Sequence, residues 1–263
     1  MELIDTHTHI YEPEFDEDRR QTMERAAEAG VGRLLFPAID SGSHERMLAV
    51  CRDYPGRCLP MMGLHPTSVN DNPQWRRELD TVERMLAAPP VERFYGVGEI
   101  GLDLYWSADW EREQTEALHA QIELALKYGL PVAIHTRNAW PQMLEVLACY
   151  RGRGLRGVMH AFCDSEEHYR RVKRLGGFKF GLGGVTTYKK GGGAELVPRM
   201  ELEDMVLETD SPYLPPVPFR GRRNESAYIP YICEHIARLK GVAAEAVAEA
   251  TTRNAVELFG LEA

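Results

Sequence analysis

The sequence predicts a closed (β/α)8 barrel, in which eight parallel strands alternate with helices. Short apolar runs rich in β-forming residues alternate with longer segments of helical periodicity from one end of the chain to the other. The length of 263 residues is close to the roughly 250 of one such barrel, and the 44% hydrophobic content can fill its core. No linker or low-complexity tract interrupts the alternation, so we expect one domain over residues 1–263.

Eight apolar runs predict the strands, and this number favours a closed barrel over an open Rossmann sheet. They span residues 3–10, 33–39, 58–66, 94–102, 131–137, 157–162, 177–184 and 205–210. Asn72 before Pro73 is typical of an N-cap followed by proline in the first turn, and Gly30, Gly129 and Gly176 stand where helices should end. The predicted helices span 16–29, 43–53, 72–87, 110–128, 140–150, 165–175, 228–239 and 243–259, with a weaker one at 195–200.

Composition excludes several classes of protein. The net charge of -9 argues against a protein that coats nucleic acid non-specifically, although bound divalent metals can add local positive charge for an anionic substrate. The five cysteines are scattered and form no C-x-x-C, so we expect reduced thiols rather than a disulfide framework or zinc ribbon. The opening MELIDTHTHI lacks a basic start followed by a long apolar run, and no window resembles a membrane span. We therefore expect a cytoplasmic protein.

His7 and His9 lie two residues apart at the end of the first predicted strand. Side chains alternate across a strand, so both imidazoles should point to the same side, into the barrel. Core histidines satisfied by their neighbours are the other interpretation, but it suits one histidine better than two at this spacing after Asp5. The pair therefore predicts metal ligands.

Four further polar residues end predicted strands, at the rim where barrel enzymes build their active sites. Glu99 stands among apolar neighbours in GVGEIGLD, and burying a carboxylate there is costly unless it is paired or binds a cation. His135 and His160 end the fifth and sixth strands, and Asp210 ends the eighth. Each alone could be a capped or hydrogen-bonded polar residue. Together with His7 and His9 they predict a metal site in which Glu99 bridges two ions.

Other residues at the same rim are candidates for substrate binding. His65 and Arg137 also end strands, and each could bind a phosphate oxygen or instead orient a metal ligand. Glu208 should point the same way as Asp210 but one layer deeper, where it would fix a histidine or arginine. The aromatic residues of the rim loops could stack on bases or simply pack, and they are Tyr105, Trp106 and Tyr213.

Basic residues follow the seventh and eighth strands, where barrel enzymes frequently bind phosphate. They favour an anionic substrate, unless they are ordinary solvated loop charges, and they are Lys189, Lys190, Arg220, Arg222 and Arg223. Glycines at 191–193 predict a flexible loop beside them.

Seven short motifs in order make this sequence resemble the TatD family of metal-dependent deoxyribonucleases. They are D-T-H-T-H, G-L-H-P, G-E-I-G-L-D, I-H-T-R, H-A-F, E-T-D-S-P and R-G-x-x-N-E, and the resemblance runs from Asp5 to about Glu225 and more loosely beyond. It implies an amidohydrolase-type barrel, two divalent metals and phosphodiester hydrolysis, with the 3′ to 5′ exonuclease activity on DNA reported in the family. Carried over residue by residue, it assigns one metal to His7, His9, Glu99 and Asp210, and the other to Glu99, His135 and His160.

The sequence departs from the family pattern at two places. Cys163 and Asp164 follow H-A-F, where the family usually has serine and glycine, and Ser226 stands where proline is common. The first departure affects the surroundings of the second metal and leaves the ligands themselves unchanged.

These features predict a divalent-metal-dependent hydrolase that cleaves phosphodiester bonds, with Asp210 accepting the proton of the attacking water and Glu99 bridging the metals. Imidazoles favour zinc, manganese or iron, whereas carboxylates and phosphate suit magnesium or manganese. The expected partner is single-stranded DNA or another phosphodiester, with neither a membrane nor an obligate protein partner.

Two alternatives remain. An amidohydrolase-type enzyme could act on a small ester, lactone or amide, although many of those carry a modified lysine on the fourth strand, where this chain has Glu99. A non-catalytic metal-bearing scaffold is less favoured because every expected ligand is present.

Overall fold

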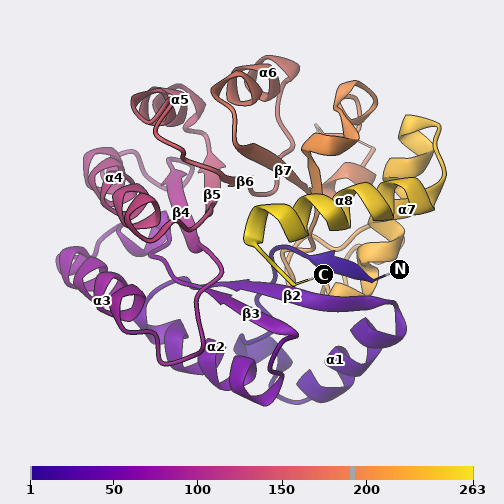
Figure 1. Ribbon diagram of the computed structural model, residues 1–263, viewed down its shortest axis with the longest axis horizontal. Coiled ribbons are helices and arrows are strands. Elements are labelled where there is room, and N and C mark those ends of the chain that lie inside the picture. Colours follow the sequence, from indigo (N-terminus) through magenta and orange to yellow (C-terminus); the bar gives the residue numbers. More distant parts are fainter. Residues whose placement is uncertain (1, 190–192, 263) are drawn as a thin grey trace.

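The computed structural model describes residues 2–189 and 193–262, which form a ring of parallel strands surrounded by helices (Figure 1). The strands are β1 (Leu3–Asp5), β2 (Val31–Pro37), β3 (Cys58–Met61), β4 (Val97–Asp103), β5 (Val132–Arg137), β6 (Gly157–Met159), β7 (Phe178–Leu182) and β8 (Met205–Leu207). The helices are α1 (Arg19–Glu28), α2 (Ser41–Asp53), α3 (Trp75–Ala87), α4 (Glu111–Tyr128), α5 (Trp140–Cys149), α6 (Glu166–Leu175), α7 (Ile229–Lys240) and α8 (Ala244–Phe259).

Two isolated bridges close the ring. Strands β1 to β3 form one parallel sheet and β4 to β8 another. Met62 pairs with Val97 between β3 and β4, and Thr8 pairs with Ser211 beyond the ends of β1 and β8. The predicted (β/α)8 barrel is therefore confirmed.

The inside of the barrel is filled with apolar side chains, and α8 lies across one end of it (Figure 1). Leu258 and Phe259 of α8 belong to the same buried cluster as Ile4 of β1, Leu35 of β2 and Val206 of β8. With the interior filled from this end, polar side chains can gather only where the strands reach their carboxyl ends. This arrangement fixes the place of the candidate site.

Several predicted element boundaries differ from the structure. Residues 195–200 do not form a helix but contain a single 3-10 turn, Val197–Arg199, with Pro198 in it. Helix α3 begins at Trp75, because the side chain of Asn72 accepts a hydrogen bond from the backbone of Gln74 (2.9 Å) and makes a separate turn before the helix. The predicted helix end at Gly129 is confirmed by its left-handed conformation (φ 65°). Lys190 and most of the predicted 191–193 loop lie outside the described residues.

In the part of the chain that the structure describes, every helix is too short or too polar to cross a bilayer.

A buried carboxylate ties the first strand to the last. Asp5 is fully buried and accepts hydrogen bonds from the backbone and hydroxyl of Thr209 (2.9 and 2.6 Å), from the hydroxyl of Ser226 (2.6 Å) and from the backbone of His7 (3.3 Å). Ser226, at the position where proline is common in the family that the sequence resembles, thus supplies a donor to this network. The network holds the loop before α7 against the His7 backbone.

We predict that Asp5→Ala lowers the free energy of unfolding by about 2–4 kcal/mol, because several buried donors lose their shared acceptor. Urea denaturation measures the effect. Asp53→Ala, at an exposed position at the end of α2, is the control and should change stability by no more than about 0.5 kcal/mol. Equal stability of the two variants would show that the Asp5 network does not hold the barrel closed.

Candidate metal centre

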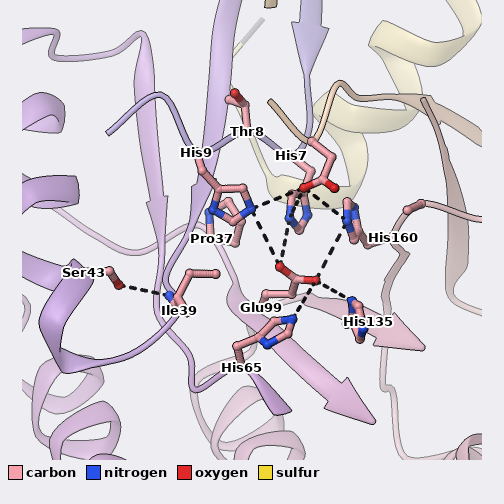
Figure 2. Close-up of polar contacts among 12 residues, drawn as sticks. His7, Thr8, His9, Pro37, Ile39, Ser43, His65, Glu99, His135 and His160 are labelled. Carbon is pink, nitrogen blue, oxygen red and sulfur yellow. Dashed lines mark hydrogen bonds and ion pairs between the residues drawn. The ribbon is translucent and has the colours of Figure 1, made fainter. Parts of the chain in front are cut away.

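The side chains predicted as metal ligands converge at the carboxyl ends of the strands. Figure 2 shows the imidazoles of His7, His9, His135 and His160 directed toward the carboxylate of Glu99, which lies on β4. Short strands bring this about, because β1 ends two residues before His7 and β6 ends directly before His160. Glu99 is only 3% exposed, so its carboxylate depends on these neighbours rather than on water.

The two oxygens of Glu99 face different groups of imidazoles. Oε2 lies 3.2 Å from Nε2 of His7 and 3.8 Å from Nε2 of His9. Oε1 lies 3.0 Å from Nδ1 of His135 and 3.9 Å from Nε2 of His160. A carboxylate divided in this way has the arrangement of a bridge between two adjacent cation sites.

Asp210 faces the same space from the opposite side. Its Oδ1 lies 3.4 Å from Nε2 of His9, 3.6 Å from Nε2 of His160 and 3.9 Å from Nε2 of His7. The backbone of Asp210 is in the left-handed region (φ 58°), and its N–H donates to the carbonyl of His7 (2.9 Å). The side chain is 18% exposed against 4% for Glu99, so Asp210 is the carboxylate that solvent reaches more easily.

Both carboxylates are ionised at neutral pH. Burial alone raises the pKa of Glu99, but the surrounding imidazoles together outweigh burial and hold it well below its usual value. Burial likewise raises the pKa of Asp210, and His160 and His9 lower it below its usual value. Two negative charges surrounded by imidazole nitrogens form the donor set that a divalent transition metal prefers.

Three groups of ligand atoms each lie within 4.8 Å of one another, the separation expected around a shared ion. They are His7 with His9 and Glu99, His7 with His160 and Asp210, and His65 with Glu99 and His135. The residues therefore fit divalent cations. The grouping differs from the one the resemblance implies, since His160 lies with Asp210 and His65 lies with Glu99.

The hydrogen bonds around His9 determine which of its ring nitrogens can bind a metal. The hydroxyl of Tyr11 donates to the carbonyl of Pro37 (2.5 Å) and lies 2.8 Å from Nδ1 of His9. Since the Tyr11 hydrogen is already used, we assign the proton of the neutral His9 ring to Nδ1. Its Nε2 then directs a lone pair toward Glu99 and Asp210, as a metal ligand requires.

The same reasoning gives His65 the opposite role. The backbone N–H of Thr67 donates to Nδ1 of His65 (3.1 Å), so the proton of this ring belongs on Nε2, 3.5 Å from Oε1 of Glu99. Burial lowers the pKa of His65, which keeps the ring neutral. His65 therefore presents a hydrogen-bond donor to the site, as either of its predicted roles requires.

Asp103 is a site residue that the sequence reasoning missed. Its Oδ2 lies 3.0 Å from Nε2 of His135, while Nδ1 of the same ring faces Glu99. Burial lowers the pKa of His135, but hydrogen bonds to Asp103 and Glu99 raise it to about 9. The signal was present in the sequence, because Asp103 follows Glu99 by four residues on the same strand and must point to the same side.

Glu208 lies one layer below the centre, as the sequence predicts. Its Oε1 accepts a hydrogen bond from the backbone of Ala161 (2.6 Å) and lies 2.9 Å from Nδ1 of His160, so Nε2 of that ring faces Asp210. Gly181 makes room for this carboxylate, because a Cβ atom there would lie 2.1 Å from Oε2 of Glu208. The position of His160 therefore depends on a glycine of β7.

The departures at Cys163 and Asp164 affect the site unequally. Cys163 lines a small enclosed space together with Glu208 and Asp210, so it borders the centre. The carboxylate of Asp164 turns instead to Nδ1 of His168, in the first turn of α6.

The basic residues of the rim divide into two kinds. Arg223, predicted to face an anionic substrate, pairs with Oδ2 of Asp18 (2.7 Å) and donates to the carbonyl of Glu14, so it fastens the loop to the α1 side of the barrel. Arg220 is exposed and stacks on the ring of Tyr188 at 4.4 Å, and Arg222 is exposed as well. Of these three arginines, Arg220 and Arg222 remain accessible to a substrate.

Known proteins resemble this chain over almost its whole length. The family model of the TatD-related DNases matches residues 4–260. The uncharacterized metal-dependent hydrolase YabD of Bacillus subtilis is 32% identical over 98% of both chains, and the human deoxyribonuclease TATDN3 is 33% identical over 98% of this chain and 94% of its own. The crystal structure of YjjV, a TatD homologue from Escherichia coli, superimposes with a TM-score of 0.90 at 30% identity, covering 99% of this chain and 98% of that one. The chain therefore belongs to the TatD-related DNase family of metal-dependent hydrolases.

Proposed function

We propose that the protein is a deoxyribonuclease of the 3′ to 5′ exonuclease type, which cleaves phosphodiester bonds of single-stranded DNA with the help of two divalent cations. The observation that carries the proposal is the division of the Glu99 oxygens between two groups of imidazoles, with Asp210 facing the same space. The name of the human relative, a deoxyribonuclease, supports DNA as the substrate.

In this proposal the predicted ligands keep their roles, and Zn, Mn or Mg is the bound ion. His7, His9, Glu99 and Asp210 would hold one cation, and Glu99, His135 and His160 would hold the other. When bound, such ions supply an activated water and positive charge for the phosphoryl oxygens. The imidazoles favour zinc or manganese as the resident metal, whereas magnesium can support turnover.

The chain itself supplies the proton acceptor and the donors. Asp210 takes the proton of the attacking water, because it is ionised and is more accessible than Glu99. The Nε2–H group of His65 and the guanidinium of Arg137 donate hydrogen bonds to phosphoryl oxygens, and Arg220 binds another phosphate further along the DNA. These three residues would then form the substrate-binding set.

We predict that elemental analysis finds up to two transition-metal equivalents per chain, and that chelation abolishes hydrolysis of a 3′-labelled single-stranded oligonucleotide. Adding back zinc, manganese or magnesium separately should restore activity and identify the effective ion. Undiminished hydrolysis by metal-free protein would refute the proposal. Hydrolysis of small esters or lactones but of no nucleic acid would instead favour the amidohydrolase alternative.

Asp210→Asn and Glu99→Gln should separate the proton acceptor from the bridge. Asparagine keeps one oxygen donor but removes the basicity, so Asp210→Asn should keep much of its metal while turnover falls by roughly 10²- to 10⁴-fold. Glu99→Gln removes the charge that neutralises both cations, so it should lose metal and activity together. Metal content, initial rate and thermal melting are measured on the same preparations. Wild-type turnover in Asp210→Asn would exclude it as the base, and loss of both metals would make it a ligand only.

The rim arginines should differ in their effect on DNA binding. Replacing Arg220 and Arg222 by alanine should weaken oligonucleotide binding at low salt and flatten the dependence of log affinity on log salt, by about 0.7 for each lost phosphate contact. Arg223→Ala is the matched control: it should leave this slope unchanged and lower the melting temperature, because Arg223 pairs with Asp18. A slope unchanged in all variants would assign Arg220 and Arg222 to solvated loop charge.

A further inference from the structure

Three side chains from the carboxyl ends of β4 and β5 form an aromatic and cationic platform beside the metal centre. Tyr105 and Trp106 follow β4, and Arg137 is the last residue of β5. The two strands are paired so that Asp103 lies opposite Arg137, and the backbone of Leu104 donates to the carbonyl of Arg137 (2.9 Å). The platform therefore sits on a fixed part of the barrel.

A short chain of contacts joins the platform to the candidate ligands. Oδ1 of Asp103 accepts a hydrogen bond from the backbone of Tyr105 (3.0 Å), while Oδ2 of the same carboxylate lies 3.0 Å from the ring of His135. Arg137 follows His135 by two residues on β5, so its side chain leaves the strand on the same side. A molecule bound on the platform would lie next to the metal centre.

The platform combines free hydrogen-bond donors with an exposed aromatic face. The guanidinium of Arg137 lies 3.6 Å from the ring centre of Tyr105 and 5.5 Å from that of Trp106, and the two rings are perpendicular (86°). Within residues 2–189 and 193–262, Arg137 forms neither an ion pair nor a side-chain hydrogen bond, unlike Arg153, which pairs with Glu123. Trp106 is 69% exposed and Tyr105 is 51% exposed.

We propose that the platform binds an unpaired nucleotide of the substrate, with its base stacked on Trp106 and its phosphate bound by Arg137. A base supplies the flat apolar face that covers an exposed indole, and a phosphate accepts the paired N–H donors of a guanidinium. Tyr105 holds the guanidinium by stacking and does not itself bind the base. Since every base has such a face, binding is tolerant of sequence.

The platform also selects against paired ends. A base inside a duplex is covered on both faces by its neighbours, and a terminal pair leaves only its outer face free and is held to the partner strand. An unpaired nucleotide can therefore place a face on Trp106 more readily than a paired one. This inference rests on the proposed function and deepens it, because it names the part of the substrate that the rim recognises.

The test compares Trp106→Ala with the wild type on two oligonucleotides, one intact and one whose last two 3′ nucleotides are abasic. In the wild type, loss of the bases should raise KM about 5- to 100-fold, with kcat changed only a few-fold. On the intact oligonucleotide, the KM of Trp106→Ala should exceed that of the wild type by the same factor. The abasic oligonucleotide should not raise the KM of Trp106→Ala further, because the stacking contact is already lost when either the base or the indole is removed. Trp106→Phe should restore much of the loss. An equal abasic penalty in the wild type and in Trp106→Ala would overturn the proposal.

Tyr231→Ala is the matched control, because Tyr231 is a 43% exposed aromatic residue on α7 with no part in the platform. Its KM on the intact oligonucleotide should equal that of the wild type. A blunt duplex should have a higher KM than the single strand in the wild type, and this difference should narrow in Trp106→Ala. An undiminished difference would count against selection by the platform.

Binding without turnover separates this inference from the proposed function. Oligothymidylate added to chelator-treated protein should quench tryptophan fluorescence in the wild type and much less in Trp106→Phe. If quenching depends on Trp106 but no DNA is cleaved with any added metal, the platform stands and the nuclease proposal fails. If DNA is cleaved while quenching and KM do not depend on Trp106, the platform is wrong and the nuclease proposal stands.

Discussion

The buried carboxylate of Glu99 is the constraint on which the rest of the site depends. Glu99 is only 3% exposed, and its negative charge can persist inside the barrel only because imidazoles approach both oxygens of the carboxylate. The surrounding strands serve this requirement, since β5 carries His135, and β1 and β6 lead into His7 and His160. This burial of ionised and polar groups creates a site whose donor atoms fit divalent cations.

A second layer decides which nitrogen of each ring faces the centre. Each of three imidazoles has one ring nitrogen that points away from Glu99 and Asp210, and a residue of this second layer contacts that nitrogen. The pairs are Tyr11 with His9, Asp103 with His135, and Glu208 with His160. His65 is the exception, because the backbone of Thr67 takes its Nδ1 lone pair and turns a donor toward Glu99. Outer contacts of this kind orient metal ligands and adjust their basicity. These outer contacts make His9, His135 and His160 candidate metal ligands and make His65 a candidate hydrogen-bond donor to the substrate, although all four side chains are imidazoles.

The rim shows how an acidic protein can still handle an anionic substrate. The net charge of -9 is spread over the whole chain, whereas the basic groups near the centre are few and mostly positioned by contacts with aromatic rings. Arg137 and Arg220 both lie over tyrosine rings, whereas Arg223 is paired with Asp18. Local placement of charge, rather than its total, therefore determines what the site can attract.

The sequence by itself determined the barrel and the residues that meet in it. Alternating apolar runs predicted every strand, and polar residues after those runs pointed to one rim, because parallel strands present their carboxyl ends together. It overestimated the helix at 195–200, where a proline and short connections leave only a 3-10 turn, and it started α3 at Asn72, whose side chain forms a separate turn.

What only the tertiary structure decided is how each side chain is used. The sequence alone gives no role to the side chains of Asp103 and Asp5. The fold places Asp103 behind His135 and Asp5 between the segments that carry β1 and β8. Arg223 and Arg220 look alike in the sequence, and they differ only because α1 brings Asp18 to one of them. Periodicity fixes the face of an element on which a residue lies, but the partner of a polar atom comes from a segment distant in the sequence, so its role follows from packing alone.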